Sequence, residues 1–381
     1  MHSPQTSIKE TFPSSRTADG CHFIGSLESI RGLAALAVAL FHSFHLLPVD
    51  GLRVFDCTLW NAPSTSALLM RMIMIPFNGG AAVSLFFVLS GYVLSLSLER
   101  DRRPFWPKAG AFTARRFLRI YPALAVNVIL LFAVFQGVAA LNLGLVLTPP
   151  TPEQLWVNLL LIDFPVNGVT WTLPVELAVI PVILLNAFFQ RRFGVVVPLL
   201  IVILGLVALF TPRLVHYSTT GNFGFLFALG MLAAELAGKG RLLHQRTPAI
   251  ILLILAISGL LSARFVLGYE SKWSLLLEGI NSAILILILV HGPRLAIHRI
   301  LEMPPLRFLG RISYSYYLYH PLTLKITMGL LPGFFTLATM EAQPFLWSAI
   351  IALVSVPAAI PFGWAGYVLI EKPASRWGRR L

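Results

Sequence analysis

The chain has 381 residues, of which 57% are hydrophobic and 12% are charged. Soluble domains carry roughly 25% charged residues, so this composition excludes a disordered chain and argues strongly against a soluble globular protein. The mean hydropathy is +0.79, and apolar stretches of about 18 or more residues recur along the whole length. We therefore expect an all-α polytopic membrane protein. Its two cysteines are too few for a disulfide framework or a thiolate metal site.

The net charge is +13, from 29 Lys and Arg against 16 Asp and Glu. In a soluble protein this excess would suggest a nucleic-acid partner. In a membrane protein, Lys and Arg first of all mark cytoplasmic loops. We therefore expect membrane lipids, and no nucleic acid, around the basic residues.

The hydropathy pattern divides the chain into three regions. Residues 1–26 are polar and rich in Ser, Thr and Pro, which predicts a disordered cytoplasmic tail. Residues 27–371 form the predicted transmembrane helical bundle, and residues 372–381 form a basic cytoplasmic tail. About ten spans are expected in the bundle, at 27–48, 80–98, 117–138, 170–190, 194–211, 222–238, 248–266, 274–292, 312–331 and 345–370.

The distribution of basic residues sets the expected orientation. With the N-terminus inside, 23 of the 29 Lys and Arg residues fall on the cytoplasmic side, five fall outside, and Lys325 lies within the ninth span. Cytoplasmic loops carry such an excess, so both termini are predicted to be cytoplasmic. The expected location is a bacterial inner membrane, crossed several times.

Two ionisable residues lie on one stripe of the first span. Arg31 and His42 are eleven residues apart, which returns to nearly the same helix face at about 100° per residue and rises about 16 Å. Ionisable residues at membrane depth are functional candidates by default. A packing role for His42 is the alternative, and a metal site with His45 is disfavoured because further ligands are missing.

A basic segment follows the second span. Arg115, Arg116 and Arg119 lie close together, and Arg115 and Arg119 share a helix face because they are four residues apart. Arginine forks match phosphate oxygens, which favours a polyanionic cytosolic ligand. Topological anchoring and attraction to anionic lipid are the alternatives. Tyr121 closes the segment and is a candidate for the same ligand.

The fourth span begins with GVTWTLPVELAV and contains a carboxylate. Glu176 is expected about five residues, or roughly 8 Å, from the outer surface. His42 is five or six residues from the outer end of its own span, so both side chains are predicted at one depth. A histidine beside a carboxylate suits a general base and its orienting partner. Glu176 reaching interfacial water is the alternative, and Trp171 nearby is a candidate for substrate contact.

The ninth span reads GRISYSYYLYHPL. Ser313, Tyr317 and His320 fall on one helix face, at i, i+4 and i+7. This face either lines a cavity or joins helices by hydrogen bonds. In the second span, Ser90 beside Gly91 is interpreted as a close-packing position rather than a chemical one.

Six segments in this order resemble the acyltransferase-3 family of membrane O-acyltransferases. They are LESIRGLAALAVALFH, FFVLSGYVLS, RRFLRIYP, WTLPVE, ISYSYYLYHP and IEKPASRW, from residue 27 to residue 377. The ordered set is specific, whereas any one segment alone would be weak. Arg31 and His42 match the family's signature of an arginine, ten residues and a histidine. The family's aspartate before this arginine is Glu28 here, and its serine after tryptophan is Thr172.

The resemblance implies a transfer of an acyl group, acetyl in the first instance, from cytosolic acyl-CoA to a hydroxyl outside. The acceptor is expected to be a carbohydrate or glycolipid. CoA phosphates are expected at Arg115, Arg116 and Arg119, with Arg31 positioning the donor. His42 is expected to act as general base, while Glu176 orients its imidazole or binds the sugar. No metal and no permanently bound cofactor are expected.

Two other classes of function stay open from the sequence. Intramembrane His, Glu and Arg residues suit a transporter or flippase that relays protons, although no inverted repeat is visible in the hydropathy. A purely structural or lipid-anchoring protein would leave the intramembrane polar groups unexplained. Within the enzyme reading, direct transfer is favoured over an acyl-enzyme because the chain has no GxSxG motif.

Overall fold

The computed structural model describes residues 25–381 except 54, 142–147, 212–218, 238–244 and 332–333. The predicted tail 1–26 therefore lies almost wholly outside the described residues. The described part is helical, and its one β-bridge joins Val49 and Leu52. The prediction of an all-α membrane protein is confirmed.

The helices that build the bundle are α1 (Gly25–Phe44), α3 (Gly79–Arg100), α4 (Phe105–Ala140), α6 (Thr172–Ala178), α7 (Ile180–Phe193), α8 (Val196–Phe210), α9 (Thr219–Leu236), α10 (Arg246–Leu267), α11 (Lys272–His291), α13 (Pro304–Leu330) and α15 (Pro344–Gly366). The shorter elements are α2 (Thr65–Met74), η1 (Ile75–Phe77), α5 (Pro152–Leu159), η2 (Gly168–Trp171), α12 (Ala296–Leu301), α14 (Leu337–Ala342), η5 (Tyr367–Glu371) and α16 (Lys372–Gly378).

Seven helical segments of the described chain are long and apolar enough to cross a membrane, and α8 and the later part of α9 are shorter apolar helices. The expected span at 312–331 corresponds to α13, which is not among the seven. Its segment ISYSYYLYHP is polar, yet most of that segment is buried. A helix surrounded by other helices does not need an apolar surface, so hydropathy under-represents α13.

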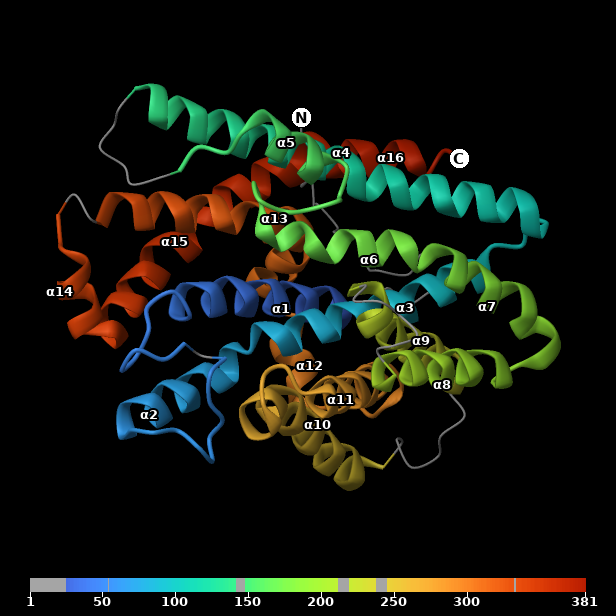
Figure 1. Cartoon of the computed structure of the whole chain (residues 1–381). Helices are drawn as coiled ribbons and strands as arrows, with labels where there is room; N and C mark the ends of the chain where they lie inside the picture. Colours follow the sequence, from blue (N-terminus) through green and yellow to red (C-terminus); the bar gives the residue numbers. More distant parts are fainter. Residues whose placement is uncertain (1–24, 54, 142–147, 212–218, 238–244, 332–333) are drawn as a thin grey trace, which may run out of the picture.

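Helix α1 occupies the middle of the bundle (Figure 1). It packs against α13 and α15 on one side and against α3 on the other. Helix α9 packs on α3, α10 pairs with α11, and α16 lies along α4. In Figure 1 the long α4 lies near the top of the view, and the α6–α7 segment lies between α4 and α3.

Glycines permit the closest helix crossings. A Cβ on Gly310 of α13 would collide with the backbone of Glu28 in α1, and one on Gly32 would meet Leu309. Similarly, a Cβ on Gly91 of α3 would collide with the Phe227 carbonyl of α9. Small residues allow helices in membranes to approach to backbone contact. Since Glu28 precedes Arg31 by three residues, the first crossing fixes where Arg31 lies relative to α13.

Candidate active site

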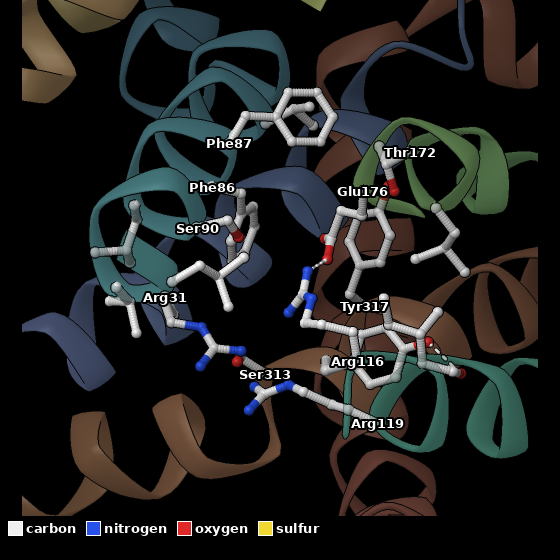
Figure 2. Close-up of a pocket in the computed structure, with 17 residues that line it drawn as sticks. Arg31, Phe86, Phe87, Ser90, Arg116, Arg119, Thr172, Glu176, Ser313 and Tyr317 are labelled. Carbon is white, nitrogen blue, oxygen red and sulfur yellow. Dashed lines mark hydrogen bonds and ion pairs between the residues drawn. The ribbon is translucent and has the colours of Figure 1, made fainter. Parts of the chain in front are cut away.

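A pocket opens between α1, α3, α4, α6 and α13 (Figure 2). Its polar lining residues are Arg31, Ser90, Arg116, Arg119, Thr172, Glu176, Ser313, Tyr314 and Tyr317. The apolar part of its wall comes mainly from α3. Three arginines and one glutamate in a helical bundle give this pocket an excess of positive charge, which favours an anionic ligand.

Arg31 lies in the second turn of α1 and reaches into the pocket (Figure 2). No hydrogen bond or ion pair joins Arg31 or Arg119 to another described residue. Electrostatically, Arg31 interacts with Glu176 and Glu371 as well as with Arg119. Two guanidinium groups thus face the pocket with donors available for a ligand.

Glu176 binds Arg116 rather than approaching His42. The Arg116 Nη2 donates to Glu176 Oε2 over 2.6 Å, and the side chains are 9% and 20% exposed. The Nε of Arg116 is buried without a partner among the described residues. No hydrogen bond joins Glu176 to the His42 imidazole among the described residues, so the expected orienting or sugar-binding role of Glu176 stays a prediction. Depth counted along separate helices does not fix which faces meet, and α6 turns Glu176 toward α4.

Arg115 also departs from its expected place. It does not line the pocket, and its Nη2 lies 3.5 Å from Asp101 Oδ2, between α3 and α4. The residues that share the pocket are Arg116 and Arg119, three apart on α4, instead of Arg115 and Arg119, four apart. Both spacings place residues on one helix face, so packing of α4 against α16 and α13 decides between them.

Asp101 belongs to an ion-pair cluster at the start of α4. Arg103 Nη2 lies 2.8 Å from Asp101 Oδ2, and Arg103 is 39% exposed. The hydrogen bonds from Arg103 hold the pKa of the Asp101 carboxyl well below its usual range. This cluster therefore stays ionised at neutral pH and engages Arg115 outside the pocket.

Hydroxyl groups line the side of the pocket formed by α13 and α6. The Ser313 Oγ is buried without a partner among the described residues. The Tyr317 hydroxyl donates to the Val169 carbonyl over 2.7 Å and lies 3.3 Å from the Thr172 hydroxyl. Ser90, interpreted from the sequence as a packing residue, faces the pocket instead (Figure 2). Ser313 and Ser90 can therefore contact a ligand directly.

Tyr121 and Trp171 lie outside the pocket. The Tyr121 hydroxyl donates to the Leu159 carbonyl over 2.8 Å, which ties α4 to α5. The Trp171 ring lies 5.1 Å from the Phe223 ring and 6.3 Å from the Phe87 ring. Phe87 itself lines the pocket, so Trp171 supports the pocket wall from behind.

A pair of histidines lies further along α1. His42 Nδ1 is 2.9 Å from His320 Nε2, and His320 Nδ1 is 2.8 Å from the Tyr317 carbonyl oxygen. His320 is 2% exposed, whereas His42 is partly exposed. The His45 ring is 6.1 Å from the His42 ring. The predicted face of Ser313, Tyr317 and His320 is thus used twice, for lining the pocket and for joining α13 to α1.

Tyr317 connects the two parts of the site. Its side chain lines the arginine pocket, and its backbone carbonyl binds His320. Arg31 and His42 stand about 16 Å apart along α1. Tyr317 therefore contacts both groups: its side chain lines the pocket, and its ring lies 5.9 Å from the His320 ring.

A comparison with protein families matches residues 24–364 to an acyltransferase domain, the acyltransferase-3 family. The chain belongs to the acyltransferase-3 family. No curated protein and no solved structure matches the chain. Family membership and the apolar helices together identify an integral, multi-pass membrane protein of an acyltransferase family.

This acyltransferase-family chain also holds polar residues that the sequence analysis did not select. Glu371 is buried in the π-helical turn η5 and accepts a hydrogen bond from Ser315 over 2.8 Å. π-Helical turns often occur at functional sites. The available signal was its place in IEKPASRW, one of the six family-like segments. Thr172, noted only as a departure from the family pattern, lines the pocket.

Proposed function

We propose that this protein is an O-acyltransferase. It moves an acyl group, acetyl in the first instance, from cytosolic acyl-CoA to a hydroxyl of a carbohydrate or glycolipid acceptor on the other side of a bacterial inner membrane. The observation that carries the proposal is that Tyr317 lines the arginine pocket and also contacts His320, the partner of His42, through its ring and its backbone carbonyl. Such a transfer requires a site for the phosphates of the donor. It also requires a base where the acyl end of the donor meets the acceptor.

The donor end of the site is the arginine pocket. Arg31 and Arg119 present guanidinium forks without partners among the described residues, and such forks bind phosphate oxygens in pairs. CoA carries its phosphates at one end and its thioester at the end of a long, thin arm. With the phosphates at Arg31 and Arg119, the arm points along α1 past Tyr317, and the thioester approaches His42. CoA is a co-substrate here and not a bound cofactor.

Glu176 has a different role in this proposal from the one expected from the sequence. Its contact with Arg116 fixes that guanidinium beside the pocket. It leaves Arg31 and Arg119 as the groups that meet the phosphates. Arg115 is not part of the donor site, because it is engaged by Asp101.

His42 is the proposed general base. It takes the proton of the acceptor hydroxyl as that oxygen attacks the thioester carbonyl. The new bond is acyl carbon to acceptor oxygen, and the bond that breaks is acyl carbon to sulfur. The proton on His42 then passes to the CoA thiolate, which leaves as the thiol. No covalent acyl-enzyme is needed.

The proposed orientation follows from the donor. The pocket lies toward the N-terminal end of α1 and the histidine pair toward its C-terminal end. A cytosolic donor therefore requires the N-terminus of α1 to face the cytoplasm, in agreement with the 23-to-5 distribution of basic residues. A reporter fused to the C-terminus should be active in the cytoplasm, and activity only outside would refute this orientation.

The direct test is incubation of the purified protein with labelled acetyl-CoA and an extract of envelope glycans, with release of CoA as the readout. His42→Ala should lower turnover roughly 10²- to 10⁴-fold, the usual contribution of a positioned base. His45→Ala is the matched control, because its ring does not contact His320, and it should retain turnover. Loss of turnover with His45→Ala but not with His42→Ala would overturn the assignment. Absence of CoA release, with transport in vesicles, would support the transporter class instead.

A further inference from the structure

The histidine pair is arranged edge to edge. The His42 and His320 rings are inclined by only 11°, and their centroids are 5.2 Å apart although the facing nitrogens are 2.9 Å apart. Face-to-face stacking would not bring one nitrogen of each ring together in this way. The short contact is therefore a hydrogen bond between ring nitrogens, and one of the two must carry the hydrogen.

The Tyr317 carbonyl decides which nitrogen carries it. A carbonyl oxygen only accepts, so His320 Nδ1, 2.8 Å away, is the donor. In a neutral imidazole the other nitrogen is then an acceptor, so His320 Nε2 accepts from His42 Nδ1. The Nε2 of His42 is left unprotonated. The hydrogen-bond network thus assigns His42 the tautomer that a general base needs.

Both rings are neutral in this arrangement. No carboxylate among the described residues bonds to His42 or His320, and His320 is 2% exposed. A buried imidazolium without an anionic partner is costly. A protonated His320 would donate from both nitrogens, and His42 would then lose its free Nε2.

Pro321 makes the Tyr317 carbonyl available. In a regular helix this carbonyl would accept from the N–H four residues later, but that residue is Pro321, which has none. The neighbouring carbonyls also bind side chains. Asn127 donates to the Leu318 carbonyl over 3.0 Å, and Thr323 donates to the His320 carbonyl over 3.0 Å. The interrupted turn of α13 is therefore satisfied by side chains, and one of these is His320 itself.

We propose that the His320–Pro321 pair is a tautomer-setting device for His42. Pro321 leaves the Tyr317 carbonyl without a backbone donor. This carbonyl then holds the hydrogen of His320 on Nδ1. As a result His320 Nε2 accepts from His42 Nδ1, and His42 Nε2 is unprotonated. His320 is a positioning residue in this scheme and takes the place that a carboxylate holds in a serine-hydrolase triad. The inference rests on the proposed function for its purpose, but the tautomer itself can be measured without any substrate.

The first test is ¹⁵N NMR of the histidine ring nitrogens in the full-length protein, with His42→Asn identifying the His42 signals by difference. The expected result is a protonated Nδ1 and an unprotonated Nε2 on His42. A protonated Nε2 on His42 overturns the proposal whatever the enzyme's substrate is. An inactive wild-type protein that shows the expected tautomer contradicts the proposed function alone.

The second test is Pro321→Ala, which restores an N–H that competes with His320 for the Tyr317 carbonyl. Turnover of acetyl-CoA should fall roughly 10- to 100-fold, the loss typical when a hydrogen-bond partner that orients a metal-ligating histidine is removed, while KM for the donor and thermal stability are maintained. Pro361→Ala, in a helix interior but exposed on α15, is the matched control and should keep full turnover.

Variants of His320 separate hydrogen bonding from packing. His320→Leu removes the acceptor for His42 Nδ1, and turnover should fall at least as far as with Pro321→Ala. His320→Gln keeps an amide oxygen as acceptor and should recover part of that loss. Wild-type turnover in Pro321→Ala, or equal turnover in the two His320 variants, would overturn the positioning role.

Discussion

Two largely buried arginine–glutamate pairs lie toward opposite ends of α1 and serve different purposes. Arg264 and Glu278 join α10 to α11, with Nε–Oε1 at 2.8 Å and Nη2–Oε2 at 3.1 Å. The ring of Tyr269 lies 4.7 Å below the guanidinium and stacks on Phe41, near the C-terminal end of α1. Arg116 and Glu176, by contrast, line the pocket that Arg31 enters near the N-terminal end.

The two pairs differ in how completely their hydrogen bonds are used. Glu278 is fully buried, and its Oε2 also accepts from Ser84 over 2.6 Å. The third nitrogen of the Arg264 guanidinium, Nη1, donates to the Tyr269 carbonyl. The Arg116 Nε has no partner among the described residues. A saturated pair holds helices together and has no capacity for a ligand, whereas an unsaturated pair beside further arginines has that capacity.

The largest expected effect comes from breaking the saturated pair. Arg264→Ala leaves the Glu278 carboxylate buried and uncompensated, which typically costs about 3–5 kcal/mol. The variant should fail to accumulate or should lose most of its thermal stability in detergent, measured by a melting curve on the monodisperse protein. The double variant Arg264→Met, Glu278→Leu should recover much of the loss, because paired apolar replacements remove the buried charge. No recovery would show that the pair does more than join helices.

A smaller effect, on binding instead of folding, is expected from Arg31→Ala. Hydrogen bonds to charged groups contribute about 1.5–3 kcal/mol, so affinity for acetyl-CoA should fall roughly 10- to 100-fold while the melting temperature is maintained. Arg31→Lys keeps the charge but loses the forked guanidinium. Its affinity for acetyl-CoA should therefore lie between those of the wild type and Arg31→Ala. Isothermal titration of the purified variants measures the affinity for acetyl-CoA, and melting curves measure their thermal stability. A large stability loss with unchanged affinity would place Arg31 with the structural pair.

Glu176→Gln should change the affinity for the donor in the opposite direction from Arg31→Ala. It removes one negative charge from the pocket while its amide oxygen can still accept from Arg116. Affinity for acetyl-CoA should rise by roughly fivefold, equivalent to about 1 kcal/mol of relieved repulsion at this range, and the gain should shrink in high salt. Glu302→Gln, at an exposed position outside the pocket, is the matched control and should leave the affinity unchanged. A loss of affinity in Glu176→Gln would show that its charge is needed to shape the pocket.

The smallest effect is expected from Asp101, which lies at the partly exposed junction between α3 and α4. Asp101→Asn breaks the partly exposed contacts with Arg103 and Arg115, and such pairs contribute about 0–1 kcal/mol. Because the folded pKa of Asp101 is lowered, its contribution is present above the usual carboxyl pKa and is lost only as pH falls through the folded value. Melting curves at pH 5–8 should therefore show a constant, small difference between wild type and variant. A difference that changes across this range would contradict the assignment.

The sequence predicts the helices of this protein better than their mutual faces. Apolar runs locate the helices, and the six family-like segments identify the family. Spacing along one helix places Arg31 and His42 on one stripe. It cannot say that Glu176 turns toward Arg116, or that Arg115 meets Asp101, because helix rotation is set by packing between helices distant in sequence.

The least predictable parts are those where local rules are broken. Pro321 within α13 would ordinarily mark a kink, and only the structure shows that its missing N–H is linked to His320 and His42. The Arg264–Glu278 pair joins residues fourteen apart across a turn between two helices, and no pattern of spacing indicates it. The partly polar helix α13, which hydropathy under-represents, supplies more polar residues to the pocket and the histidine pair than any other helix.

In the proposed function, the pocket between α1, α4 and α13 binds acyl-CoA through its arginines. The most direct measurement compares the affinity of purified Arg119→Ala and Arg115→Ala for acetyl-CoA, by titration at low salt. Both variants remove one arginine from α4, four residues apart, but only Arg119 lines the pocket. We predict a loss of roughly 10- to 100-fold for Arg119→Ala and little change for Arg115→Ala. Equal losses in the two variants, or a loss only with Arg115→Ala, would contradict the claim.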